Sequence, residues 1–113
     1  MPSNLNSVLL EGVILKKSKH GIIRVKGISS IRFSVKSIRQ YIDDAPEISI
    51  FEVEAFGKLA ETCAVECIKD RGLRVVGRLR QENDEVDGVK VSQTWIIAEH
   101  VEFKPLSVEK EQT

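Results

Sequence analysis

The sequence of 113 residues predicts an all-β fold, a small five-stranded barrel with one short α-helix between the third and fourth strands. Three observations predict it. Five segments have the composition or alternation of β-strands, one segment alone has the apolar spacing of a helix, and two of the strands contain an interior glycine, Gly12 and Gly77. A glycine inside a strand is typical of the bulges and bends by which a small barrel turns its corners.

The first half of the chain supplies three long strands. Ser7–Lys17 is the first, and a turn at residues 18–21 and the segment "IIRVK" follow it. The second has the clearest alternation in the chain, typical of a strand with one buried face: Ile31, Phe33 and Val35 on one side, Arg32, Ser34 and Lys36 on the other. Residues 43–47, "DDAPE", interrupt the pattern, and Ile48–Phe56 is the third strand.

The single helix follows Gly57. Between residues 58 and 70 the apolar side chains recur at helical spacing: Leu59, Ala60, Cys63, Ala64, Cys67 and Ile68. Gly72 has the position of a helix C-terminal glycine. We interpret Cys63 and Cys67 as thiols that pack on one helix face, because their spacing is not that of a redox or zinc pair and no other ligand stands nearby.

The remaining segments complete the barrel. Residues 73–80, "LRVVGRLR", form the fourth strand, residues 81–88 an acidic hairpin loop that closes on Asp87-Gly88, and residues 89–104 the last strand. This order, with the lone helix after the third strand, is that of the OB-fold, a Greek-key barrel. Other small β-barrels share parts of the pattern. We expect one OB-fold domain over residues 1–104 and a short polar tail over residues 105–113.

Several function classes are not supported by the composition. No apolar run is long enough to cross a bilayer, and the first ten residues lack the features of a secretory signal, so we expect a cytoplasmic protein without a membrane partner. His20 and His100 each stand without a nucleophile or a matched acid nearby in the sequence. We therefore expect that the protein is not an enzyme and that it binds neither a metal nor a cofactor.

The net charge of zero hides a segregation of charge along the chain. Residues 1–40 hold eight Lys or Arg and one acidic residue, whereas residues 41–67 hold one base and seven acids. Residues 68–81 are again basic and residues 82–113 acidic. Such segregation can build a basic face that binds phosphates. It is equally compatible with neighbouring strands of opposite charge that pair with each other.

Several short segments of the sequence resemble those of bacterial single-stranded DNA-binding proteins. "FGKLAE" at residues 56–61 and "GRLR" at residues 77–80 match segments of that family, "NSVLLEGVI" is similar to its first strand, and "WIIAEHVEFK" to its last. The resemblance spans residues 6–104. It implies an OB barrel on which bases stack on aromatic side chains while Lys and Arg follow the backbone, without sequence preference.

The resemblance also implies a set of binding residues. The phosphate contacts would come from the basic residues of the second and fourth strands: Arg32, Lys36, Arg39, Arg74, Arg78 and Arg80. Tyr41 and Phe56 fall where the family places stacking aromatics. Two further aromatic positions fall on Ile50 and near Asp84.

The sequence departs from the family in the positions of its acidic residues. The hairpin segment after "GRLR" is acidic here, and the open face of the third strand carries Glu52 and Glu54. We interpret these two glutamates as cross-strand partners of Arg32, Lys36 or Arg39. By strand parity Phe33, Phe51 and Phe103 belong to the core, and Trp95, which has no stacking counterpart in the family, serves packing or a subunit interface.

The sequence therefore predicts a non-catalytic protein that binds single-stranded DNA in replication, recombination and repair. The alternative is an OB-fold protein-interaction module, like a primosome accessory protein, with weak or lost nucleic-acid binding. The family resemblance further implies a homotetramer assembled through first-strand edges. The polar tail lacks the acidic tip that recruits replication proteins to longer members.

Overall fold

The computed structural model describes residues 3–19 and 21–106, and it confirms the all-β barrel with one helix between the third and fourth barrel strands. The elements in chain order are β1 (Val8–Lys17), β2 (Ile23–Val25), β3 (Ile28–Arg39), β4 (Glu47–Phe56), α1 (Gly57–Glu66), β5 (Gly72–Val86) and β6 (Val89–Phe103). β2 is a short addition that pairs only with β3, so the barrel itself consists of β1, β3, β4, β5 and β6.

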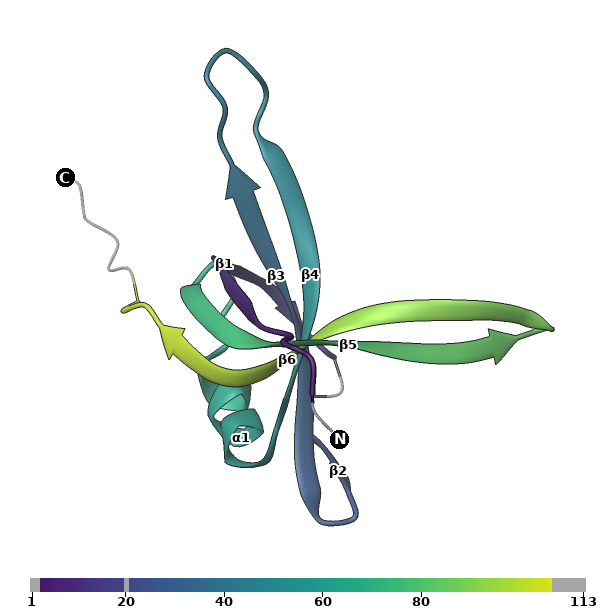
Figure 1. Cartoon of the computed structure of the whole chain (residues 1–113). Coiled ribbons are helices and arrows are strands. Elements are labelled where there is room, and N and C mark those ends of the chain that lie inside the picture. Colours follow the sequence, from purple (N-terminus) through teal and green to yellow (C-terminus); the bar gives the residue numbers. More distant parts are fainter. Residues whose placement is uncertain (1–2, 20, 107–113) are drawn as a thin grey trace.

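β1 closes the barrel because it pairs with two strands. Residues 8–13 pair with β5 and residues 13–17 pair with β3, with a register shift between Ile14 and Lys16. The hydrogen-bonded order β1-β5-β6-β4-β3 thus returns to β1. Helix α1 packs against β3, β4 and β6, and Figure 1 shows it beside the barrel.

The two interior glycines lie where strands cross closely, as the sequence predicts. A Cβ at Gly12 would lie 2.3 Å from the carbonyl oxygen of Lys36, and one at Gly77 would lie 2.0 Å from that of Ile97. Gly77 also lies at the register shift between β5 and β6. Neither backbone could approach so closely if the glycine carried a side chain.

The core is apolar and comes from the inward side of each strand and from α1. Its most buried members include the three alternating residues of β3: Ile31, Phe33 and Val35. The prediction for Phe51 is wrong. This side chain has inward parity but is 40% exposed, since it lies where β4 leaves the barrel. Phe103 is partly buried against the core.

The two cysteines of the helical region are buried and free. Cys63 lies within α1 and Cys67 caps its C-terminal end. The hydrogen bond that the Cys67 thiol donates to the neighbouring Cys63, together with burial, raises the pKa of Cys67. The packing role predicted for both residues agrees with this environment.

The ends of α1 differ partly from the prediction. Gly57 begins the helix with φ of 67°, a left-handed conformation that allows the sharp exit from β4. Gly72 does not end it: α1 stops at Glu66, the left-handed residue in the connection is Asp70, and Gly72 begins β5. Arg71 donates to the Glu66 carbonyl at the helix end, as basic side chains can.

Two long hairpins project from the barrel (Figure 1). The predicted acidic loop at residues 81–88 is wrong, because β5 continues to Val86 and β6 begins at Val89. Only Asp87 and Gly88 form the turn, with φ of 51° and 79°, as the Asp-Gly dipeptide predicts. The hairpin β3–β4 extends to the pair Arg39–Glu47.

Two further sequence predictions concern the polar tail and the lack of a membrane-spanning segment. Most of the predicted polar tail, residues 107–113, lies outside the described residues. Within the described residues, no helix has both the length and the apolar composition needed to cross a membrane.

Gly77→Ala should destabilise the fold by roughly 1–3 kcal/mol, because its methyl group would overlap backbone atoms of β6. Gly72→Ala in the same strand is the matched control. Its methyl group would meet only the flexible Lys104 side chain, so the change should be under about 1 kcal/mol. Urea unfolding measures both, and equal stabilities would contradict the role given to Gly77.

Candidate functional site

The two projecting hairpins separate at one point of the barrel. There β4 and β6 lie parallel and pair through only two positions, Val53 with Ile96 and Glu54 with Ile97. On the N-terminal side of this contact β4 continues into the hairpin with β3, and β6 into the hairpin with β5 (Figure 1). The outward side chains of all four strands therefore meet at this place, which we call the junction.

Glu54 is the centre of the junction. Its side chain is only 7% exposed, and each of its oxygens accepts from a different arginine. Arg32 Nε lies 3.2 Å from Oε2, and Arg80 Nη2 lies 2.8 Å from Oε1. Arg32 faces Glu54 directly across the β3–β4 ladder, so the predicted cross-strand pairing is confirmed for this pair.

Arg32 also covers Trp95. The guanidinium carbon lies 4.0 Å from the centroid of the indole ring, and Trp95 is 5% exposed. The indole Nε1 donates to Glu82 at 3.0 Å, and Arg32 Nη2 lies 3.6 Å from the other oxygen of Glu82. Trp95 thus packs within the chain, the first of the two roles predicted for it, and the partner on its face is a cation.

Phe56 lies at the border of the junction. It has the predicted outward parity and is 38% exposed. The guanidinium carbon of Arg80 lies 5.9 Å from its ring centroid. An exposed aromatic ring beside a guanidinium can accept a planar base or a phosphate-linked sugar.

The outward row of the β3–β4 hairpin leads away from the junction. Ser34 donates to Glu52, Lys36 faces Ile50, and Ile38 faces Ile48. These three isoleucines are more than half exposed. Among the described residues, neither Lys36 nor Arg39 has a carboxylate within 4.0 Å. Both cations are therefore available to an anion.

Tyr41 follows the end of β3. Its ring is 46% exposed, and its hydroxyl donates to Glu47 Oε1 at 2.9 Å. This hydrogen bond ties the tyrosine to β4 at the outer part of the hairpin, while leaving ring surface open to solvent.

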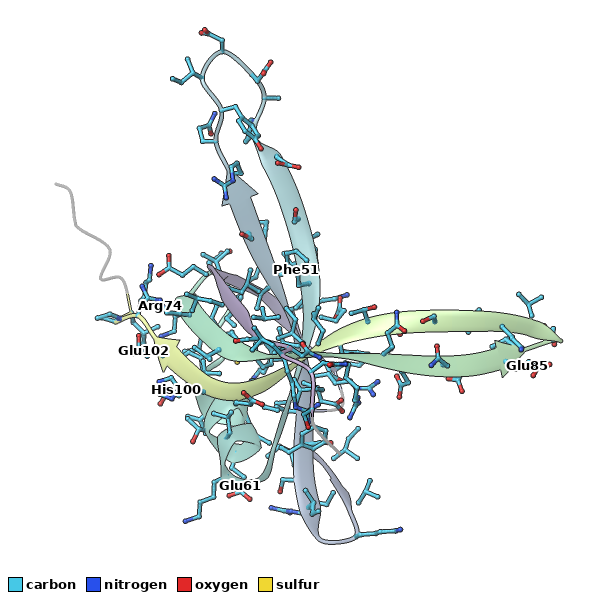
Figure 2. All side chains as sticks on the ribbon, viewed as in Figure 1. Phe51, Glu61, Arg74, Glu85, His100 and Glu102 are labelled. Carbon is cyan, nitrogen blue, oxygen red and sulfur yellow. The ribbon has the colours of Figure 1, made fainter. Side chains whose placement is uncertain are left out.

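The side chains of Arg74 and Arg78 pair with carboxylates other than those of the junction. Arg74 donates twice to Glu11 of β1, at 2.7 and 3.1 Å, and lies 3.9 Å from Glu102. Arg78 lies 3.4 Å from Glu99. Figure 2 shows Arg74 and Glu102 together where β5 begins and β6 ends, at the opposite end of these strands from Glu85.

The Arg74–Glu11 pair is strong enough to affect both titrations. The hydrogen bond from Arg74 and the charge of Lys104 lower the pKa of Glu11, and Glu11 in turn raises the pKa of Arg74. Both groups are solvent-exposed. The charge segregation of the sequence is therefore expressed largely as pairs between neighbouring strands.

The contact between Trp95 and Arg32, and the bridge from Glu54 to Arg80, were not predicted from the sequence. Both depend on the register of β6 against β4 and β5, where Arg80 faces Trp95. The only feature of the sequence that points to these contacts is strand parity, which places Arg80 and Trp95 on the outward side of their strands. Within residues 3–19 and 21–106, no group of His, Cys, Asp or Glu could hold a metal.

Comparisons with known proteins agree with this architecture. The model of a family described as "SSB: Single-strand binding protein family" matches residues 5–104. A protein named single-stranded DNA-binding protein from Aquifex aeolicus is 37% identical over 79 residues, which cover 66% of this chain and 54% of that protein. The chain thus spans about half the length of this curated relative.

Two solved structures share the fold. The Plasmodium falciparum SSB in complex with ssDNA superposes with a TM-score of 0.80 at 16% identity, covering 93% of this chain and 99% of that one. The small single-stranded DNA-binding protein from Streptomyces coelicolor gives a TM-score of 0.72 at 20% identity, covering 90% and 96%. At these identities the likeness establishes the fold.

The Arg74→Met variant should return the pKa of the Glu11 carboxyl towards its ordinary value of 4.5, because the hydrogen bond that lowers it is lost. In the native protein this ion pair stabilises the fold above pH 4.5, the ordinary pKa of a glutamate. The stabilisation is lost as the pH falls through the lowered pKa of Glu11. A carboxyl ¹³C NMR titration measures the change. An unchanged midpoint in the variant would show that the pair does not form.

Proposed function

Because the chain belongs to the single-strand binding protein family, we propose that it binds single-stranded DNA without sequence preference and without catalysis. The observation that carries this proposal is the junction, where two arginines and an exposed phenylalanine lie at the base of two projecting hairpins. Such binding would hold exposed strands during replication, recombination and repair, in the cytoplasm.

The proposed interface combines cations and aromatic rings. Arg32, Arg80, Lys36 and Arg39 would contact phosphates, while bases stack on Phe56 and Tyr41. Stacking on an aromatic side chain contributes on the order of 1–3 kcal/mol per base and tolerates any base. The row from the junction to Tyr41 follows the β3–β4 hairpin, so the strand would run along that hairpin.

The acids of the junction should lower the affinity of this binding and flatten its salt dependence. Glu54 and Glu82 together balance the charges of Arg32 and Arg80, so phosphates must compete with carboxylates for the same guanidiniums. Lys36 and Arg39 supply the uncompensated charge. The salt dependence should therefore be set mainly by the phosphates that these two cations neutralise, since its slope grows with the number of phosphates neutralised.

Arg74 and Arg78 form a secondary part of the proposed path along β5. Each is engaged with a carboxylate of a neighbouring strand. Their side chains remain about half exposed, and exposed pairs of this kind are weak and screened by salt. We therefore assign them a weaker contact than that of Arg32 and Arg80.

We also propose self-association through β1. Over residues 8–12 this strand pairs with β5 on one side only. Its other side lines an open hollow of about 710 Å³ together with Lys36, Ile38 and Arg39, and Leu9 is 72% exposed. An unpaired apolar edge favours pairing with a second copy, and a homotetramer would join the basic surfaces of several subunits.

A protein-interaction module is the second candidate. The feature that favours it is the β5–β6 hairpin, whose outward side carries exposed Val86, Val89 and Val91 beside Glu82 and Asp84. An apolar and acidic hairpin suits a protein partner better than a phosphate backbone. Binding of a replication protein there is compatible with DNA binding at the junction.

The anisotropy of labelled oligo-dT, titrated at low and moderate salt, tests the proposed function. We expect saturable binding that weakens with salt. Phe56→Ala and Tyr41→Ala should each reduce the affinity by roughly tenfold, since each removes one stacking surface. Oligo-dA and mixed sequences should bind with similar affinity. No binding to any single strand at low salt would contradict the proposal and favour the interaction module.

Glu54→Gln should increase the affinity for oligo-dT and steepen its dependence on log salt by about 0.7 for each phosphate gained, because two guanidiniums lose their carboxylate. Glu11→Gln, which releases only Arg74, should have a smaller effect. Glu61→Gln is the control, since its partner Arg24 stands apart from the proposed path. Equal slopes for Glu54→Gln and Glu61→Gln would exclude Arg32 and Arg80 from the phosphate contacts.

A further inference from the structure

We propose that Trp95 is an additional base-stacking site, which Arg32 covers in the free protein and uncovers when single-stranded DNA binds. The inference rests on the proposed function and adds to it a stacking residue on β6, in a strand that supplies none of the expected aromatic contacts. In this account the phosphates of the strand draw the Arg32 side chain off the ring, and a base takes its place.

The geometry above the indole ring suits such an exchange. A guanidinium lying 4.0 Å from the ring centroid is a planar cation held against the π-face. A nucleobase is also planar and stacks on the same surface. Since the ring is almost inaccessible while Arg32 covers it, the site exists only when that side chain moves.

Glu54 and Trp95 each keep one hydrogen-bond partner when Arg32 leaves. Glu54 keeps its shorter hydrogen bond, from Arg80 at 2.8 Å, so the buried carboxylate retains a charged partner. The indole Nε1 keeps Glu82 at 3.0 Å, so the ring retains its orientation. Glu54 Oε2 loses the hydrogen bond from Arg32, but the carboxylate as a whole keeps a charged partner, which limits the cost of the movement.

The Arg32 side chain is free to move towards solvent. It is 41% exposed, and its contact with Glu82 at 3.6 Å joins two groups that are both more than 40% exposed. Ion pairs at this level of exposure contribute little and are screened by salt. A phosphate can therefore replace Glu82 as the partner of Arg32, and the one part-buried hydrogen bond given up is that from Arg32 to Glu54.

A hollow beside the ring provides space for the incoming strand. It has a volume of about 200 Å³ and is lined by Arg32, Trp95, Lys16, Lys17, Ser34 and Glu52. Lys16 can attract phosphates, whereas Lys17 donates to the Ala64 carbonyl at 2.8 Å and Glu52, which accepts from Ser34, repels them. The backbone would thus lie towards Lys16 and a base towards Trp95.

Arg80 connects this site to the interface already proposed. It faces Trp95 across the β5–β6 ladder and lies 5.9 Å from the ring of Phe56. A strand that contacts both rings therefore passes over Arg80.

The emission of Trp95 tests the inference directly, because Trp95 is the only tryptophan in the chain. The wild-type protein is titrated with unlabelled oligo-dT at low salt, and in parallel with labelled oligo-dT followed by anisotropy. We expect the emission to be quenched with the same midpoint as the anisotropy change. Anisotropy that saturates while emission stays constant would overturn the inference and leave the proposed function intact; an absence of both changes would overturn both.

Variants provide a second and independent test. Arg32→Met should increase quenching of the free protein by acrylamide, because the ring loses its cover, whereas Arg24→Met, an exposed arginine paired with Glu61, should not. Trp95→Leu should bind oligo-dT roughly tenfold more weakly and Trp95→Phe should stay close to wild type. Thermal unfolding establishes that each variant is folded. A folded Trp95→Leu variant with wild-type affinity would overturn the inference.

Discussion

The structure depends on one buried carboxylate at the place where two hairpins part. Glu54 receives a guanidinium from β3 and another from β5, so one side chain of β4 links three strands of the barrel. β4 and β6 share only two backbone pairs there, and the ion pairs supplement a short ladder. Removing one partner of a buried pair costs about 3–5 kcal/mol, and Glu54 has two partners, which allows one of them to leave.

This arrangement gives the junction two competing roles. The arginines that organise the barrel are those best placed to receive phosphates, and Glu54 and Glu82 already occupy them. The free energy of binding a nucleic acid is then the difference between the ion pairs formed with phosphates and those given up with carboxylates. Lys36 and Arg39 are the cations outside that competition. The cover of Trp95 by Arg32 follows from the same competition, because the ring becomes available only when the arginine changes partner.

Local patterns predicted most of the barrel. The alternation from Ile31 to Lys36 identified a half-buried strand, Asp87-Gly88 identified the hairpin turn, and Glu54 was expected to pair across strands. The failures have long-range causes. Parity assigned Phe51 to the core without showing where the barrel ends. The polar segment at residues 81–88 was interpreted as a loop because a projecting hairpin has no buried face to produce alternation, and the Trp95–Arg32 contact depends on strands distant in sequence.

The most direct measurement follows the arginines themselves, by ¹H–¹⁵N NMR of the Nε–Hε groups during titration with oligo-dT. The central claim is that Arg32 and Arg80 exchange carboxylate partners for phosphates. It predicts that these two resonances move on binding, while those of Arg24 and Arg71, which lie outside the proposed path, stay in place. Saturation of the protein with oligo-dT while the Arg32 and Arg80 resonances remain unchanged would contradict it.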